Sequence, residues 1–476
     1  MTAVAATHKP RLQLWVFVVA GGVITALSLG VRSTFGLLLE PIAEGLGSGL
    51  GPIAFAIAVQ NLMWGFSQPI AGALSDRFGA PAVLSAGGAL YALALLLMAT
   101  ADGTGAILLT GGFLTGIAVG AASFAVVLSA VGRNAPPERR SLLLGLVSAI
   151  GSLGQFVLIP VAQGLLQNVS WQQTSVVLAI VLVPIIFIAP LMRSRVVKPG
   201  DTAGGEVAVT EMPKQPLRAD LRKAARSRSY LLLNTAFFTC GFHVTFIGVH
   251  LPGFVNVTGL SASTASTALA LIGLFNVVGS LLVGVLGQRI AFTYLLAGIY
   301  GLRAVSIGIF FLMPITTTTV IVFGIVMGVL WLSTVPPTSA IVTQLFGPAN
   351  AGALFGVVFL SHQLGSFLGA WLGGEIFDAT ESYSIMWVVV AILGLYAMFV
   401  HLFINESPIV DEPQKGGRRG GIRWGSATAA IALVIAGTFA GVSLTAEAAA
   451  LESTGEVDRR PVVTYCALGP SLHSSR

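Results

Sequence analysis

Arg32 and His243 are the two residues of this chain whose types and spacing point most clearly to a chemical role. They stand 211 residues apart, and the same spacing relates Pro41 to Pro252. A guanidinium group binds a carboxylate through two parallel hydrogen bonds, and an imidazole changes charge near neutral pH. If the spacing marks an internal repeat, these two groups occupy equivalent positions and could together bind an anion and a proton.

Other polar side chains recur at helical spacing within apolar stretches. Such side chains are costly where they face hydrocarbon, so we expect them to face a bundle interior or water. Stripes of Ser, Thr and Gly have a second explanation, because they also allow close packing of helices. The candidates for binding a solute are Arg32, Gln60, Gln155, His243, His250, Asn276, Trp331 and His362.

A duplicated unit must position these side chains. Residues 72–79 (GALSDRFG) recur 212 residues later as residues 284–291 (GVLGQRIA). Two glycine pairs share that offset: Gly112 with Gly324, and Gly116 with Gly328. Matches at nearly one spacing indicate two copies of one unit, and parallel repeats in membrane proteins enclose a central substrate site.

The composition is that of a membrane protein. Hydrophobic residues make up 55% of the chain and charged residues only 9%, against roughly 25% charged in soluble domains. The apolar runs approach the ~20 residues that a spanning helix needs. We predict an all-α integral membrane fold whose twelve helices form two six-helix repeats around a central cavity. The predicted spans lie near 13–38, 53–75, 81–101, 105–130, 141–163, 172–192, 231–255, 265–287, 291–313, 317–338, 350–374 and 383–404.

The repeat divides the chain into four predicted parts. They are an N-terminal six-helix bundle (1–192), a basic linker (193–230), a C-terminal six-helix bundle (231–404) and a tail (405–476). The tail contains an apolar run at 426–444 that is long enough for a thirteenth helix. Its flanking residues also resemble a misplaced secretory signal, so both interpretations stay open.

Basic and acidic residues occupy alternate connections between the predicted spans. Residues 193–230 carry nine basic groups, and Arg77 and Arg289 lie in other connections of that kind. The acids occupy the remaining connections: Glu40, Glu44, Asp102, Asp378 and Glu381. Basic loops stay cytoplasmic, so we expect a multi-pass protein of the bacterial plasma (inner) membrane with a cytoplasmic N-terminus. The pI of 9.6 therefore reflects topology, and we expect contact with membrane lipid but no nucleic-acid partner.

Several function classes are excluded by what the sequence lacks. Its two cysteines, Cys240 and Cys466, do not support a disulfide framework or a cysteine metal cluster. No phosphate-binding Gly-Lys-Ser/Thr loop and no metal-site spacing of His, Asp or Glu is present. We expect no enzyme, no catalytic residue, no cofactor and no ATP-driven pump.

The repeated G-x-L-x-D-R-x-G pattern on a six-plus-six chain resembles the major facilitator superfamily over roughly residues 12–404. In that family this loop helps to hold the outward-open state. The resemblance thus implies gating roles for the motif residues, which are Gly72, Asp76, Arg77, Gly79 and, in the second copy, Arg289. This chain departs from the pattern at Ala80-Pro81, where basic residues usually follow, and at Gln288, where the second copy has lost its acid. A tight turn that needs Gly72 and Gly79 is the structural alternative and is compatible with gating.

Within the family, the chain looks like the bacterial branch related to monocarboxylate porters and oxalate/formate exchangers. The residues that carry this likeness are 32–36 (RSTFG), 240–243 (CGFH), 250–252 (HLP), 331–337 (WLSTVPP) and 362–365 (HQLG). Such proteins place charged residues in spans 8 and 11, where this chain has only Asn276 and His362. The resemblance implies a monomeric secondary transporter of a small organic anion, a monocarboxylate above all. The alternatives are an exporter of a hydrophobic or cationic compound and a non-transporting membrane sensor on the same fold.

Arg32 leads the site hypothesis because it lies about 13 Å below the end of its span at 1.5 Å per residue. The predicted spans hold no carboxylate at a matching depth. An anionic substrate would supply the missing partner, although helix-end carbonyls or water could also satisfy this arginine. The repeat places His243 opposite Arg32, so His243 is the first candidate for a proton carrier, ahead of His250 and His362.

The predicted topology can be tested with single cysteines introduced at Glu44, at Asp378 and within residues 193–230. An impermeant thiol reagent applied to intact cells should label the first two positions and leave the third unlabelled, because basic connections stay inside. External labelling within residues 193–230 would overturn the assignment.

Overall fold

The computed structural model describes residues 8–122, 124–135, 139–193, 217–347 and 350–409, which form a single compact unit. Within this part of the chain the regular structure is helical, and twelve segments are long and apolar enough to cross a membrane. The twelve predicted spans are therefore confirmed. The middle of the basic linker and nearly all of the tail, with its apolar run at 426–444, lie outside the described residues.

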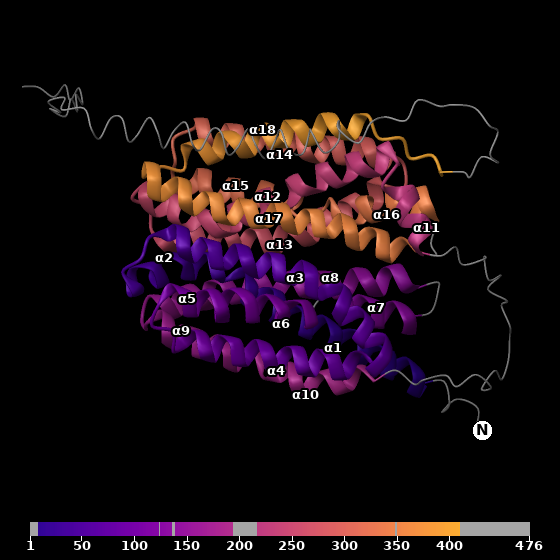
Figure 1. Ribbon diagram of the computed structural model, residues 1–476, viewed down its shortest axis with the longest axis horizontal. Helices are drawn as coiled ribbons and strands as arrows, with labels where there is room; N and C mark the ends of the chain where they lie inside the picture. The colour runs from indigo at the N-terminus through magenta and orange to yellow at the C-terminus, as the bar shows by residue number, and fades with distance from the viewer. Residues whose placement is uncertain (1–7, 123, 136–138, 194–216, 348–349, 410–476) are drawn as a thin grey trace, which may run out of the picture. The chain divides into compact units, whose positions relative to one another are not determined.

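The first half of the fold (residues 8–193) supplies six spans, several of them built from more than one helical segment (Figure 1). Its elements are α1 (His8–Ser33), α2 (Phe35–Leu46), α3 (Leu50–Phe78), α4 (Ala80–Ala99), α5 (Thr104–Ile107), a π-helix (Leu108–Leu114), α6 (Thr115–Ala121), α7 (Phe124–Asn134), α8 (Arg140–Leu166), α9 (Trp171–Leu182), α10 (Pro184–Ile188) and a 3₁₀ turn (Ala189–Met192).

The second half (residues 217–409) supplies the other six spans after a short basic helix. Its elements are α11 (Leu217–Ala224), α12 (Arg228–Val257), α13 (Ala262–Leu286), α14 (Phe292–Leu312), α15 (Thr317–Leu330), α16 (Val335–Phe346), α17 (Ala351–Thr380) and α18 (Ser384–Leu402). Helices α3 and α8 of the first half pack against α17 and α13 of the second half, respectively (Figure 1).

The glycines that revealed the repeat make equivalent helix contacts in both halves. A Cβ atom added at Gly112 would lie 2.8 Å from the carbonyl oxygen of Ala56, and one added at Gly324 would lie 2.7 Å from that of Ala268. Ala56 and Ala268 are themselves 212 residues apart. Only glycine permits so close an approach of two helix backbones. We call the two close approaches, Gly112 to Ala56 and Gly324 to Ala268, the glycine contacts.

Two of the breaks within membrane-spanning segments bear on the candidate site. The first span breaks at Thr34, between α1 and α2. The tenth span breaks between Leu330 and Val335, and it continues as α16 to Phe346, beyond the predicted end at 338. Pro336 and Pro337 account for this second break, because proline removes the backbone N–H that continues a helix.

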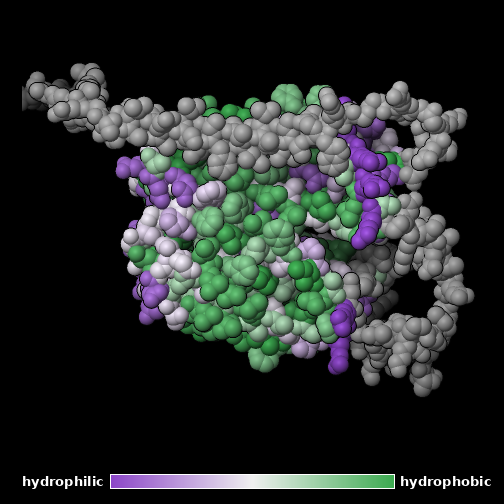
Figure 2. Space-filling model, in the orientation of Figure 1, coloured by the Kyte–Doolittle hydropathy of each residue, from purple (hydrophilic) through white to green (hydrophobic). Residues whose placement is uncertain are grey.

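The surface of the spans is apolar, as lipid contact requires. Large hydrophobic side chains such as Ile180, Leu281 and Leu312 are more than half exposed. Figure 2 shows a hydrophobic band over the middle of the visible face, with hydrophilic residues toward both ends of the helices. Apolar exposure on this scale fits a bilayer, where it carries no hydration penalty.

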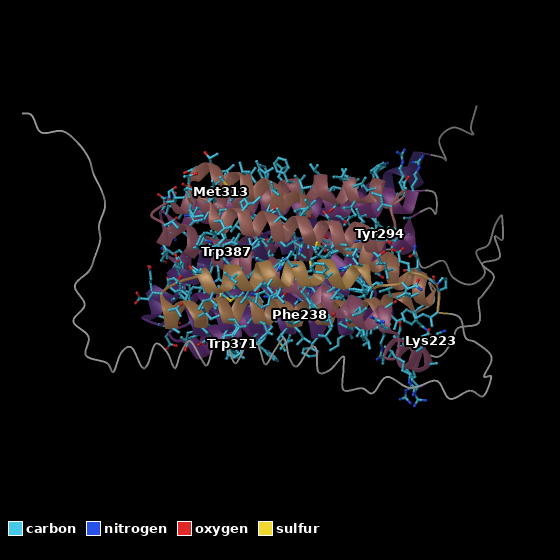
Figure 3. The ribbon with its side chains drawn as sticks, turned by 90° about the horizontal axis from the view of Figure 1, so that it is seen from above. Lys223, Phe238, Tyr294, Met313, Trp371 and Trp387 are labelled. Carbon is cyan, nitrogen blue, oxygen red and sulfur yellow. The ribbon has the colours of Figure 1, made fainter. Side chains whose placement is uncertain are left out.

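The two ends of the helices differ in charge. Acidic residues lie at one end, which we call the acidic end: Glu40, Glu44, Asp102, Asp378 and Glu381. Arg77, Arg289 and the basic residues of α11 lie at the other end, which we call the basic end. In Figure 3, Met313 and Trp371 lie toward the acidic end, and Tyr294 and Lys223 lie toward the basic end.

Asp378 joins the two halves at the acidic end. Its Oδ1 accepts a hydrogen bond from the backbone N–H of Leu50 at 2.9 Å, and its Oδ2 accepts one from that of Gly51 at 2.6 Å. A carboxylate at a helix N-terminus satisfies donors that have no partner within the helix and also interacts favourably with the helix dipole. Asp378, at the end of α17, therefore caps α3 of the other half.

A second contact between the halves lies beside this cap. Asn256 of α12 donates from Nδ2 to Oε2 of Glu40 in α2 at 2.6 Å. Tyr383 lies next to it, and burial together with the carboxylates of Glu40 and Asp378 raises the pKa of this phenol above its usual range. Tyr383 therefore stays neutral near both acids. Hydrogen bonds thus join the two halves at the acidic end in this conformation.

Asp378→Ala should shift the protein toward a conformation that is open at the acidic end. Losing the cap costs about 1 kcal/mol, which is roughly a fivefold change in the ratio of two conformations. Spin labels at Gln167 and Ser263, in opposite halves, would report the change as a longer distance in electron resonance. Asp102→Asn is the matched control, since that exposed acid lies at the same end and should leave the distance unchanged.

Candidate functional site

Arg32 lies in the last turn of α1, directly before the break at Thr34. Its Nη2 donates a hydrogen bond to Oδ1 of Asn61 in α3. The guanidinium also lies over the indole ring of Trp64, with 4.6 Å between Cζ and the ring centroid. Its position favours a cation, because the C-terminal end of a helix carries partial negative charge.

Arg32 is only partly satisfied by these contacts. Its Nε is buried without a hydrogen-bond partner, and so are the indole Nε1 of Trp64 and the hydroxyl of Ser28, one helical turn before Arg32. Tyr91 of α4 also has an unpartnered buried hydroxyl, close enough to Arg32 for an electrostatic interaction. Buried polar atoms in folded proteins nearly always have partners, so this group of unsatisfied atoms requires an explanation.

The charge of Arg32 is not neutralised by the protein in the part that the structure describes. There, its contacts are an amide oxygen and an aromatic ring, and no carboxylate is paired with it. A cation held by neutral groups in a membrane protein is electrostatically unfavourable. The arrangement therefore suits an anion that arrives from solution and offers oxygen atoms to the unpartnered donors.

Hydrogen bonds connect Arg32 to His362 across the interface between the halves. Gln363 of α17 donates from Nε2 to the backbone oxygen of Asn61 at 2.8 Å. Its Oε1 lies 3.0 Å from Nδ1 of His362. Aromatic contacts run parallel to these bonds, since Trp64 packs against Phe359 at 5.5 Å, and Phe359 stacks on His362 at 5.6 Å between ring centroids.

The repeat led us to expect His243 opposite Arg32, but the side chain of His243 packs within the second half. It is fully buried, and its Nε2 lies 2.8 Å from the backbone oxygen of Val390 in α18. His250 is also fully buried, with Nε2 2.7 Å from the backbone oxygen of Ala370 in α17. Both histidines thus pack within the second half. Equivalent backbone positions did not give equivalent surroundings, because α18 covers the side of α12 that carries His243.

The remaining polar candidates divide between the interface and the bundle interiors. Asn276 lies at the interface, where its Nδ2 donates to Oγ of Ser152 in α8 at 3.0 Å. Gln155 lies nearby, since a Cβ added at Gly273 would come within 2.8 Å of its side chain. Gln60 is instead buried in the first half, where its Nε2 donates to the backbone oxygen of Gly111 at 2.9 Å.

Trp331 is the first residue of the break in the tenth span. A buried arginine contacts the backbone at this point. Arg303 of α14 donates from Nε and Nη2 to the backbone oxygen of Leu330, at 3.0 and 2.5 Å, and from Nη2 to that of Trp331. Arg303 therefore satisfies the carbonyl groups at the C-terminal end of α15. The backbone N–H of Leu332 donates to Oδ1 of Asn276 at 3.0 Å, so the break is held from both sides.

For the loop motif at residues 72–79, at the basic end, the structure describes chiefly the backbone. Gly79 has φ +87°, a conformation that residues with a side chain rarely adopt, and its N–H bonds to the oxygen of Ser75 at 2.9 Å. Arg77 lies over the ring of Phe78. A Cβ added at Gly72 would meet no neighbouring atom, so Gly72 is not required for packing here. The side chain of Asp76 lies outside the described residues, and the gating role of this motif and of the exposed Arg289 stays a prediction.

The candidate site chosen from the sequence left out three residues of the arrangement around Arg32: Asn61, Trp64 and Gln363. Two of them carried a signal, because Asn61 and Trp64 lie three positions apart and therefore on one side of a largely apolar helix. Gln363 directly follows His362 and would face a different direction on an isolated helix. Its role depends on the packing of α17 against α3.

Comparisons with known proteins agree with this architecture. The sequence profile of the Major Facilitator Superfamily matches residues 21–355. The uncharacterized MFS-type transporter YhjX of Escherichia coli (strain K12) is 26% identical over 348 residues, which are 73% of this chain and 84% of that protein. Monocarboxylate transporter 13 of Rattus norvegicus is 25% identical over 411 residues, which are 84% of this chain and 92% of that transporter. The uncharacterized MFS-type transporter YcxA of Bacillus subtilis (strain 168) is 24% identical over 405 residues, which are 82% of this chain and 95% of that protein.

Arg303→Leu should destabilise the protein, because it leaves the carbonyl groups of Leu330 and Trp331 buried without donors. Each unsatisfied group costs about 1–3 kcal/mol, so the apparent melting temperature of the purified protein in detergent should fall. Arg32→Leu is the matched control. It removes a cation that is only partly satisfied, so it should leave the melting temperature near that of the wild type. Equal melting temperatures for Arg303→Leu and the wild type would contradict the role of Arg303.

Proposed function

This chain belongs to the Major Facilitator Superfamily of membrane transporters, and on that premise we propose that it moves a small organic anion across the membrane by alternating access. The observation that carries the proposal is the Arg32 guanidinium. It lies beside the interface of the halves with no carboxylate partner in the described structure and with unpartnered donors around it. A planar guanidinium offers a carboxylate two parallel hydrogen bonds, so a carboxylate is the anion that fits it best.

Monocarboxylates are the favoured substrate class. Several relatives of similar length carry the name monocarboxylate transporter, among them number 13 of Rattus norvegicus and number 11 of Homo sapiens. A single carboxylate would also suit the charge of the site, since Arg32 is the one cation among the described residues there and the surrounding groups are neutral amide, indole and hydroxyl groups. A doubly charged anion would leave one charge without a partner.

Residues 1–192 and 231–404 form the two moving bundles in this proposal, joined by the linker at 193–230. The protein is a monomer of the bacterial inner membrane with its N-terminus in the cytoplasm. The contacts at Asp378 and Glu40 close the acidic, external end in this conformation. Opening that end breaks these bonds, and the 72–79 motif, with Asp76, then holds the basic end closed.

Arg32→Gln should abolish uptake of radiolabelled carboxylates into proteoliposomes, because the substrate loses its charged partner. Arg32→Lys should recover only part of the activity, since an ammonium group keeps the charge but not the two parallel donors. Melting temperatures measured on the same samples separate loss of function from loss of fold. Unchanged substrate affinity in Arg32→Gln would assign Arg32 a structural role and remove the main support for an anionic substrate.

A further inference from the structure

Gln363 fixes the orientation of its own amide group. The backbone oxygen of Asn61 can only accept a hydrogen bond, and the nearest Gln363 atom lies 2.8 Å from it. That atom must therefore be the amide nitrogen, Nε2. The amide oxygen, Oε1, consequently faces Nδ1 of His362 at 3.0 Å.

The orientation of Gln363 decides which ring nitrogen of His362 carries a hydrogen. An amide oxygen can only accept, so Nδ1 of His362 must be the donor. Ser366 leads to the same conclusion, since its hydroxyl donates to the backbone oxygen of Gly241 at 3.2 Å and leaves its oxygen to face Nδ1 at 3.5 Å. In the neutral ring, Nε2 therefore carries the lone pair and is the atom that can accept a proton.

His362 also differs from the other buried histidines in exposure. It is 7% exposed, whereas His243 and His250 are 0% exposed and have Nε2 against a backbone oxygen. A backbone oxygen accepts only, so Nε2 of those two residues must carry the hydrogen of the neutral ring. Their remaining nitrogens are buried without partners. His362 alone among these three combines partial exposure with a tautomer fixed by contacts to the interface.

We propose that Gln363 is a positioning residue that holds His362 in the Nδ1–H tautomer, so that Nε2 of His362 accepts the proton that enters with the anion at Arg32. The proposal rests on the transport function proposed above. It moves the proton-binding role from His243 to His362. The proton comes from water on the side from which the anion enters and returns to water on the other side, so the transport cycle leaves the protein unchanged.

The charged groups near His362 provide a reason for coupling. On α12, the thiol of Cys240 lies beside His362, and Nη1 of Arg303 in α14 lies 3.5 Å from its sulfur. On the α3 side, Arg32 is reached through Asn61 and Gln363. In the described structure the groups around this site thus include the ionisable thiol of Cys240 and two cations. An anion bound at Arg32 offsets the two cations, so anion and proton each favour the binding of the other.

The central test is Gln363→Glu, which keeps the shape of the side chain and places a negative charge beside Nδ1–H of His362. We expect the pH dependence of carboxylate uptake to move to higher pH by about one unit, a roughly tenfold change in proton affinity. The measurement is uptake of radiolabelled lactate, pyruvate and benzoate into proteoliposomes from pH 5 to pH 9. A midpoint equal to that of the wild type would overturn the proposal.

Two further variants separate positioning from a general structural effect. Gln363→Leu should flatten the pH profile and reduce proton-driven accumulation, while counterflow exchange of preloaded anion persists. The double variant His362→Asn with Gln363→Glu should have the same profile as His362→Asn, because the new carboxylate then has no imidazole to act on. An additional shift in the double variant would show that Gln363 acts on another group and would contradict the proposal.

His401→Asn is the matched control. His401 is buried in the second half, where its Nδ1 lies 2.7 Å from the backbone oxygen of Ala397 and its ring stacks on Tyr300. Replacing it should leave the pH profile unchanged. If the wild type carries none of the three anions, the proposed function fails and this inference fails with it. If the wild type carries them and Gln363→Glu has no effect on the profile, only the inference fails.

Discussion

A helix that breaks inside a membrane leaves backbone groups that only the protein can satisfy, and this constraint organises the second half of the fold. The tenth span breaks after Leu330, next to two prolines. Arg303 then donates to the carbonyl groups at the end of α15, and Asn276 accepts the N–H of Leu332. Because Asn276 also donates to Ser152 in α8, the same contacts that repair the break bring the two halves together at the interface.

Two arginines inside the membrane-spanning region, Arg303 and Arg32, have different roles. Arg303 is fully buried and donates to the backbone oxygens of Leu330 and Trp331, which makes it part of the framework. Arg32 stands in the last turn of α1, where it keeps an unpartnered Nε and has unpartnered neighbours. A group that the protein leaves incompletely satisfied is free to bind a ligand, and a group that is already satisfied is not. This difference supports a binding role for Arg32 and a structural one for Arg303.

Much of the fold could be predicted because each span carries its own signal of length and hydropathy. Arg32 could be selected for a similar reason, since a cation in an apolar segment is conspicuous without a structure. The partners of His243 could not be predicted, because the repeat gives its place on α12 but not the helix that covers it. The roles of Asn61, Gln363 and Arg303 depend on contacts between α3 and α17 and on the exact end of α15. Such contacts arise only when distant segments pack together.

The glycine contacts have a consequence for how the two halves could diverge after duplication. At Gly112 and Gly324 the neighbouring carbonyl groups leave no space for even a methyl group. Polar residues differ at equivalent positions of the two copies: Arg32 in the first is His243 in the second, and Asp76 is Gln288. The ancestral unit thus passed on a fixed helix spacing to both descendants, while each was free to acquire its own chemistry. The two halves therefore share a framework of helix contacts and differ in the polar residues that it carries.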